Sequence, residues 1–129
     1  MHVETPTVGA DRQIIQSYHD GGFVVSGVRH EGSLLVLPDR VLAWPVRTIE
    51  ELTPESLEPL RAAGLDILVI GTGAGFSLVG AELRATVRAW GPVIEAMATN
   101  AACRTYNILL AEERRVAAAV IAVSDDKAS

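Results

Sequence analysis

The pattern of apolar and polar positions changes near residue 50, and the two halves of the chain predict different structure. In the first half, short apolar stretches alternate with glycine and proline, which is typical of hairpin strands. Ser26-Gly27 lies between two such stretches, as a tight hairpin turn would, and Pro38-Asp39 indicates a second turn. Trp44 precedes a proline, which favours extended backbone there. The expected strands are Gln13–Tyr18, Gly22–Val25, Val28–His30, Ser33–Leu37 and Val41–Trp44.

The second half alternates helical and strand patterns. Thr53-Pro54 predicts a helix start, because threonine caps helices and proline fits their first position, and Gly64 predicts its end. Asp66–Ile70 is an expected strand, apolar at four consecutive positions and therefore covered on both faces. The later expected elements are a helix over Ala81–Trp90, a strand over Val93–Met97, a helix capped by Thr99 or Asn100 and running to about Glu113, and a central strand over Val116–Val123.

This order of elements predicts the fold class. Strands that alternate with helices build a largely parallel sheet whose faces the helices cover. We therefore expect an α/β fold in a single three-layer domain, in which the early hairpins add a β layer or extend the sheet as antiparallel strands. The chain has 129 residues, the usual size of one domain. The domain is expected over residues 12–123, between an N-terminal extension of residues 1–11 and a flexible tail of residues 124–129.

Composition narrows the class of protein. Hydrophobic residues make up 49% of the chain, which excludes a disordered protein, and no apolar run approaches the roughly 20 residues of a membrane helix. The formal net charge of −5 argues against a binder of nucleic acid or anionic membranes. The first residues resemble neither a secretory signal nor a transit peptide. We therefore expect a cytoplasmic protein with no nucleic acid partner and no membrane insertion.

Cysteine and histidine are few. Cys103 is the single cysteine, which excludes an intramolecular disulfide and suits a reducing compartment. His2, His19 and His30 fall in no metal-ligand spacing. We expect no bound metal and no cofactor.

A glycine-rich segment directly follows the predicted strand Asp66–Ile70. Ligands of open α/β sheets bind at the carboxyl ends of strands, and backbone N–H groups in such a loop can hold phosphate or carboxylate. The dinucleotide and P-loop fingerprints both require glycine where this chain has Phe76, and the next helix, near Ala81, starts too late to face the first glycines. A flexible strand-to-helix turn is the alternative. The candidate ligand-binding residues are Gly71, Thr72, Gly73 and Gly75, with Arg104 as an anion partner.

The last predicted helix carries three further candidates. Cys103 lies in its first turns, where the helix dipole and Arg104 would lower the thiol pKa. A nucleophilic cysteine also needs a histidine base, and the pattern favours a buried, small hydrophobic residue instead. Tyr106 is expected as a core aromatic whose hydroxyl finds a partner at the rim. Asn107 is expected to face solvent or to bind a neighbouring loop. No residue is assigned a catalytic role.

Several motifs at a characteristic mutual spacing carry a family resemblance. Leu68–Gly73 closes a predicted strand, and Thr99–Leu110 contains the run Ala-Cys-Arg-Thr-Tyr-Asn. Together with Gly22-Phe23, Leu35–Pro38 and Trp44-Pro45, they resemble a family of small uncharacterised α/β domains that includes the mitochondrial respiratory complex I assembly factor 3. The resemblance covers about residues 12–122.

The resemblance implies a mixed central sheet with helices on one side and a β layer on the other. It also implies soluble members and, for the mitochondrial branch, a role in complex I assembly. It supplies no catalytic residue, cofactor or substrate. Its motifs add Trp44 to the candidate functional residues Cys103, Tyr106 and Asn107.

Three functions stay open at this stage. The leading hypothesis is a non-enzymatic interaction module that binds complex I subunits or assembly intermediates, which predicts a concentrated exposed apolar patch. The rival is a binder of, or an enzyme for, a small anion or phosphate-bearing ligand at the glycine loop and Arg104, which predicts a pocket lined by both. The third is a scaffold that contacts identical copies as a homo-oligomer.

Overall fold

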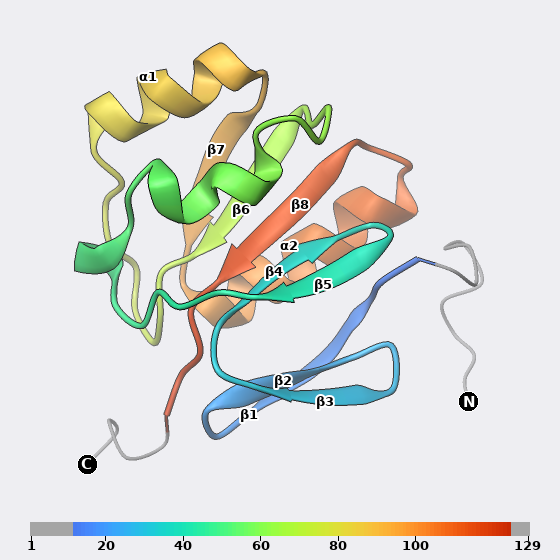
Figure 1. The fold of residues 1–129 in the computed structure, drawn as a ribbon. Helices are drawn as coiled ribbons and strands as arrows, with labels where there is room; N and C mark the ends of the chain where they lie inside the picture. Colours follow the sequence, from blue (N-terminus) through green and yellow to red (C-terminus); the bar gives the residue numbers. More distant parts are fainter. Residues whose placement is uncertain (1–11, 125–129) are drawn as a thin grey trace.

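A computed structural model describes residues 12–124, which form two β-sheets and two α-helices (Figure 1). The larger sheet has the strand order β5-β4-β8-β6-β7, and the smaller, antiparallel sheet has the order β1-β2-β3. The strands are β1 (Ile15–His19), β2 (Gly22–Val25), β3 (Val28–Glu31), β4 (Leu34–Leu37), β5 (Arg40–Ala43), β6 (Ile67–Gly71), β7 (Val93–Met97) and β8 (Val116–Val120). In the larger sheet, β6 is parallel to β7 and β8, whereas β4 is antiparallel to β5 and β8.

The predicted α/β class, with a mixed central sheet and an added β layer, is confirmed. The hairpin turn predicted at Ser26-Gly27 joins β2 to β3, and both residues have positive φ, 48° and 85°. Of the expected terminal segments, residues 1–11 and 125–129 lie outside the described residues. No helix within residues 12–124 is long and apolar enough to span a lipid bilayer.

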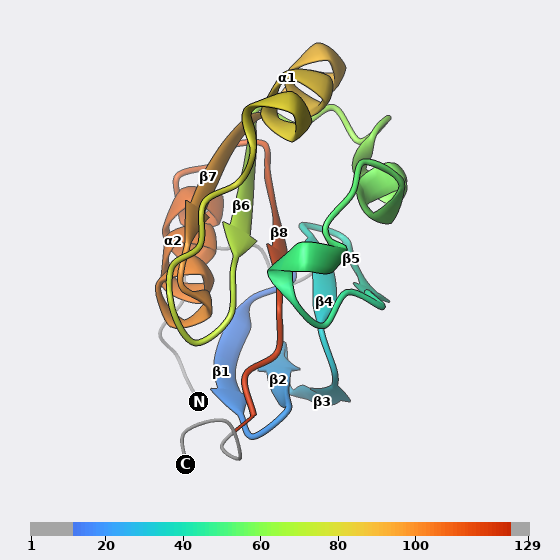
Figure 2. The ribbon, with the colours of Figure 1, turned by 90° about the vertical axis from the view of Figure 1, so that its left-hand side faces the viewer.

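The two helices, α1 (Ala81–Trp90) and α2 (Thr99–Ala111), lie on opposite faces of the large sheet, not on one face as the resemblance implied (Figure 2). Topology explains this difference. The chain moves outward from β6 to β7 through α1, and then returns past β6 to β8 through α2. Crossovers between parallel strands are right-handed, so opposite directions of travel place the two helices on opposite faces.

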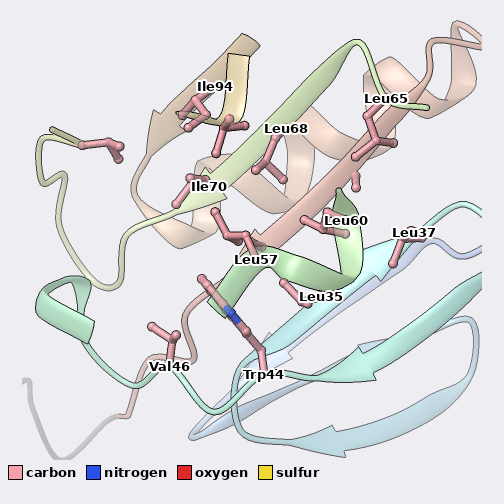
Figure 3. Packing of buried hydrophobic residues seen from close by; sticks show 14 of the residues in the cluster. Leu35, Leu37, Trp44, Val46, Leu57, Leu60, Leu65, Leu68, Ile70 and Ile94 are labelled. Carbon is pink, nitrogen blue, oxygen red and sulfur yellow. The ribbon is translucent and has the colours of Figure 1, made fainter. Parts of the chain in front are cut away.

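The side chains of β6 point alternately into two hydrophobic cores, one on each face of the large sheet. Val69 faces α2 and the small sheet, and packs in one cluster with Phe23 and Tyr106. Leu68 and Ile70 face the other way. On that face they meet leucines from a 3-10 helix, η2 (Glu55–Leu60), as Figure 3 shows. A central strand that is apolar at consecutive positions is therefore covered on both sides, as its sequence predicted.

Trp44 belongs to the core beside η2. Its side chain is buried, and its indole Nε1–H donates to the carbonyl of Ser56 at 2.9 Å. A short 3-10 helix, η2, replaces the α-helix expected between Thr53 and Gly64, and a second one, η1 (Ile49–Glu51), precedes it. Pro59 lies inside η2, where it cannot donate the hydrogen bond that an α-helix needs. Trp44 therefore has a packing role here.

The last strand ends at Val120, earlier than expected, and the residues after it bond to several segments. The N–H of Ile121 donates to the carbonyl of Gly71 at 3.0 Å, and the N–H of Ala122 donates to Ser33 Oγ at 2.9 Å. The carbonyl of Val123 accepts from the N–H of Gly21, in the β1–β2 turn, at 2.9 Å. This stretch thereby joins the large sheet to the small one.

Candidate functional site

The glycine loop leaves the end of β6 and is bonded to the start of α2. The N–H of Gly73 donates to Thr99 Oγ1 at 3.0 Å, and the N–H of Thr99 donates to the carbonyl of Gly73 at 2.8 Å. The N–H of Thr72 donates to the carbonyl of Met97 at 2.8 Å. These two loop N–H groups, which the ligand hypothesis assigned to an anion, are therefore used within the fold.

Position 71, at the same junction, has no room for a side chain and therefore requires glycine. A Cβ on this residue would lie 2.9 Å from Thr99 Oγ1 and 3.1 Å from Val120 Cγ1, closer than side chains normally approach. The missing side chain therefore lets the end of β6 meet both α2 and β8. This explains one glycine of the motif by packing.

Thr99 is the residue of this junction that the sequence did not reveal. Its side chain is buried, and its hydroxyl donates to the carbonyl of Ile121 at 2.7 Å while accepting the N–H of Gly73. The prediction that Thr99 or Asn100 caps the helix is wrong, because the N-cap position is Ala98 and no side chain caps it. In the sequence, Thr99 is visible only as a polar residue at the start of a helix. A capping residue has the same appearance, so the sequence does not distinguish the two roles.

Arg104 does not meet the glycine loop through a hydrogen bond. Its guanidinium is exposed and donates to the carbonyl of Asn100, one turn earlier in α2, at 3.4 Å. Within residues 12–124, no three His, Cys, Asp or Glu side chains form a group that could hold a metal ion.

Cys103 faces the core between α2 and the sheet. Its side chain is 5% exposed, and burial raises the pKa of the thiol from 9.0 to about 12, although the neighbouring Arg104 charge acts in the opposite direction. At neutral pH the thiol is protonated, and it packs as a small hydrophobic side chain.

Tyr106 and Asn107 attach the small sheet to α2. Tyr106 is fully buried, and its hydroxyl donates to the carbonyl of Gln13 at 2.9 Å, which matches the expected core aromatic. Asn107 Nδ2 donates to the carbonyl of Ile15 at 2.7 Å, and Asn107 Oδ1 accepts the N–H of Ile15 at 3.0 Å. Its partner is therefore a strand, neither solvent nor a loop. One amide side chain satisfies both backbone groups at the edge of β1.

A second part of the glycine segment is open to solvent. Phe76 and Leu78, on the loop between β6 and α1, are 59% and 80% exposed. Thr72 shapes this loop, because its hydroxyl donates to the carbonyl of Gly75 at 2.7 Å and accepts the N–H of Ser77 at 3.1 Å. In the sequence, Phe76 was notable only because it departs from the nucleotide-binding fingerprints, so its exposure to solvent was not predicted.

Leu78 lines a groove of about 480 Å³ between the loop, η1 and α1. The loop passes beside η1 before it rises to α1 (Figure 1). The apolar residues of the lining are Ile49, Leu52, Pro54, Leu78, Val79 and Leu83. The groove therefore joins three segments that are separated in the sequence.

Comparison with known proteins identifies relatives over almost the whole described domain. Residues 15–121 match the family described as "Protein of unknown function (DUF498/DUF598)". The chain is 32% identical over 114 residues to the NADH dehydrogenase (ubiquinone) 1 alpha subcomplex assembly factor 3 of Xenopus tropicalis, covering 87% of this chain and 62% of that protein. It is 36% identical over 109 residues to an uncharacterized protein of Rhodobacter capsulatus, covering 83% of this chain and 82% of that protein.

Solved structures agree with this assignment. The fold is similar to that of a Bartonella henselae protein described as an outer membrane protein, with a TM-score of 0.81, 32% identity, and coverage of 89% of this chain and 98% of that one. It is also similar to an NMR structure of a Rhodopseudomonas palustris protein, with a TM-score of 0.77, 39% identity, and coverage of 98% and 93%. The chain therefore belongs to the DUF498/DUF598 family and is homologous to complex I assembly factor 3, which confirms the family that its motifs resembled.

Proposed function

We propose that this protein is a non-enzymatic interaction module that acts in the assembly of respiratory complex I. The observation that carries the proposal is the similarity to assembly factor 3 proteins, which covers 87% of this chain for the Xenopus tropicalis protein and 84% for that of Danio rerio. The chain spans only 62% and 63% of those relatives' lengths, so the proposed activity is one that the shared domain performs.

The exposed loop supports a protein partner. Large exposed apolar patches mark protein-binding surfaces. Phe76 and Leu78 are two exposed apolar side chains on one loop, which Thr72 holds by hydrogen bonds, and Leu78 also lines the apolar groove. The expected partners are complex I subunits or assembly intermediates. We place this activity in the cytoplasm, where an unpaired thiol such as Cys103 stays reduced.

The ligand hypothesis receives less support from the geometry. A ligand at the glycine loop would lack the N–H groups of Thr72 and Gly73, which Met97 and Thr99 already accept. Self-association is tested directly by sedimentation equilibrium of the purified chain, in which a single species of 13.7 kDa would exclude a homo-oligomeric scaffold.

Deletion and co-purification test the proposal. The protein is tagged at its native locus, purified in mild detergent and analysed by mass spectrometry, while native gels measure complex I in a deletion strain and in the same strain complemented with the intact gene. Complex I subunits should co-elute, and assembled complex I should fall in the deletion strain and return on complementation. Normal complex I levels in the deletion strain would refute the proposed function.

A further inference from the structure

We propose that the groove between η1, the β6–α1 loop and α1 is a docking site for an apolar segment of a partner protein that carries flanking lysine or arginine residues. This inference rests on the proposed function, because it assigns the surface and the partner chemistry of the interaction module. Three features of the groove lead to it: its apolar walls, its fixed floor and the glutamates in or next to its lining.

Apolar side chains from all three segments form the walls. Ile49 and Leu52 come from η1 and the residue after it, Leu78 from the loop and Leu83 from α1. Leu78 is the most exposed large hydrophobic side chain of the described residues, at 80%. Covering an exposed leucine removes apolar surface from water, so an apolar partner segment gains binding energy here.

The floor of the groove is held by the fold before any partner arrives. Val79 is buried, and its carbonyl accepts Arg84 Nε–H at 3.1 Å. Arg84 Nη1 also donates to the carbonyl of Ile94 in β7 at 2.9 Å, which fixes α1 against the sheet. Together with the Thr72 bonds in the loop, these contacts reduce the conformational entropy that binding must remove.

Glutamates lie in the lining of the groove or next to its lining residues in the sequence. Glu50 and Glu51 lie on η1, Glu55 starts η2, and Glu82 lines the groove from α1. Glu51 accepts the N–H of Arg47 at 2.6 Å. The carboxylates of the other three glutamates form no hydrogen bond or ion pair with any residue of 12–124. Positive side chains beside the apolar segment of a partner would complement them.

The same charge argues against a second copy of this chain as the occupant. A two-fold symmetric contact places the same patch of each copy against the other. The glutamates at the groove of one copy would then lie against the same acidic patch of the other copy, and like charges across an interface are repulsive. The groove is therefore assigned to a different protein with basic residues.

Two synthetic peptides test the assignment. An amphipathic peptide of about 18 residues made of leucine and lysine, and a counterpart made of leucine and glutamate, are titrated into the full chain at about 0.15 M salt. Methyl NMR signals report binding. The Leu/Lys peptide should shift Ile49, Leu52, Leu78 and Leu83 and bind about tenfold more tightly than the Leu/Glu peptide. Equal affinities, or shifts centred on the exposed face of α2, would overturn the proposal.

Matched variants distinguish binding at the groove from non-specific hydrophobic and electrostatic attraction of the peptide. Leu78→Ser and Glu82→Lys should each weaken Leu/Lys binding about fivefold or more. Ile108→Ser and Glu112→Lys change an exposed apolar residue and an exposed acid at α2, on the opposite face of the sheet, and should change binding less than about twofold. Equal effects in the two pairs would contradict the proposal. Thermal unfolding of each variant checks that it is folded.

A strain experiment distinguishes this inference from the proposed function. The deletion strain receives either the intact gene or the double variant L78S/E82K. If deletion lowers complex I and the double variant restores it fully, the groove assignment is wrong and the proposed function stands. If deletion leaves complex I unchanged while the peptides bind as expected, the proposed function is wrong and the docking site stands. Failure of the double variant to restore complex I, at normal protein abundance, supports both.

Discussion

The two faces of the large sheet are built differently. On the face covered by α2 and the small sheet, side chains of α2 form hydrogen bonds to distant segments: Tyr106 to Gln13, Asn107 to Ile15, and Thr99 to Gly73 and Ile121. On the other face, α1 and the 3-10 helices leave a groove lined by apolar side chains in contact with water. The first face fixes the arrangement of the chain, and the second keeps apolar surface available.

The helices show the same contrast. The buried residues of α2 are Thr99, Ala102, Cys103, Tyr106 and Leu110, whereas α1 buries only Val87. A helix with few buried side chains contributes less to global stability. We therefore expect substitutions on α2 to cost more stability than substitutions on α1. Substitutions on each face test this division.

The largest effect is expected at Tyr106. Tyr106→Ala removes a fully buried ring and leaves the Gln13 carbonyl without its partner, so the free energy of unfolding should fall by about 3–5 kcal/mol. Leu83→Ala, at the half-buried wall of the groove, should cost about 1 kcal/mol. Urea unfolding measures both. Similar losses for the two variants would contradict the division between the faces.

The second largest loss of stability is expected at Asn107. Asn107→Ala leaves the N–H and the carbonyl of Ile15 unpaired at the edge of β1, so we expect a loss of about 1–3 kcal/mol. Faster hydrogen exchange at the Ile15 amide, measured by NMR, would locate the effect. Arg104→Ala, at an exposed position of the same helix, is the control and should stay within about 0.5 kcal/mol. A slow Ile15 amide in the Asn107 variant would show that another group replaces the side chain.

Alkaline pH should weaken the α2 face. The unfolded chain releases the Cys103 proton near pH 9.0, whereas burial keeps the thiol of the folded chain protonated until about pH 12. Burial also raises the pKa of Tyr106. Because the unfolded state then binds fewer protons than the folded state, the contribution of these two groups to stability should be present in full well below pH 9 and should be lost as pH rises above it. Urea midpoints between pH 7 and pH 10 measure this, with Cys103→Ala expected to flatten the decline.

The smallest effect on stability is expected at Leu78. Its side chain is already 80% exposed, so Leu78→Ser should change the free energy of unfolding by less than about 0.5 kcal/mol. The same variant should shorten retention on a hydrophobic-interaction column, compared with the wild-type chain and with Val69→Ala, which alters only a buried residue. A large loss of stability would mean that Leu78 supports the core, which would place the groove among structural features.

Local signals in the sequence were sufficient for most of the fold. Ser26-Gly27 predicted its hairpin because the turn depends on two adjacent residues with positive φ. The apolar runs of β6 and β8 predicted buried strands for the same kind of reason. Local signals could not predict which face of the large sheet each helix covers. The helix α2 lies on the face opposite α1 only because the chain returns from β7 past β6 to β8.

The candidate site was predicted less well, because its contacts join distant segments. Asn107 bonds to a residue 92 positions away, and Thr99 to residues 26 and 22 positions away. No periodicity along the chain reports such pairs. Gly71 lies at a crowded strand end, which the glycine motif did not predict. The resemblance of this motif to an anion-binding loop depended on N–H groups whose partners only the folded structure reveals.

The position of β8 has a consequence for synthesis of the protein. It is the last described strand in the chain, yet it lies between β4 and β6 and pairs with both. Until residues 116–120 leave the ribosome, the β4–β5 hairpin and the β6–β7 pair cannot join, and each exposes an unpaired edge. Such edges promote aggregation of nascent chains. Ribosome-bound chains that stop before residue 116 should therefore depend on chaperones, and release of the final strand should complete folding of the sheet in one step.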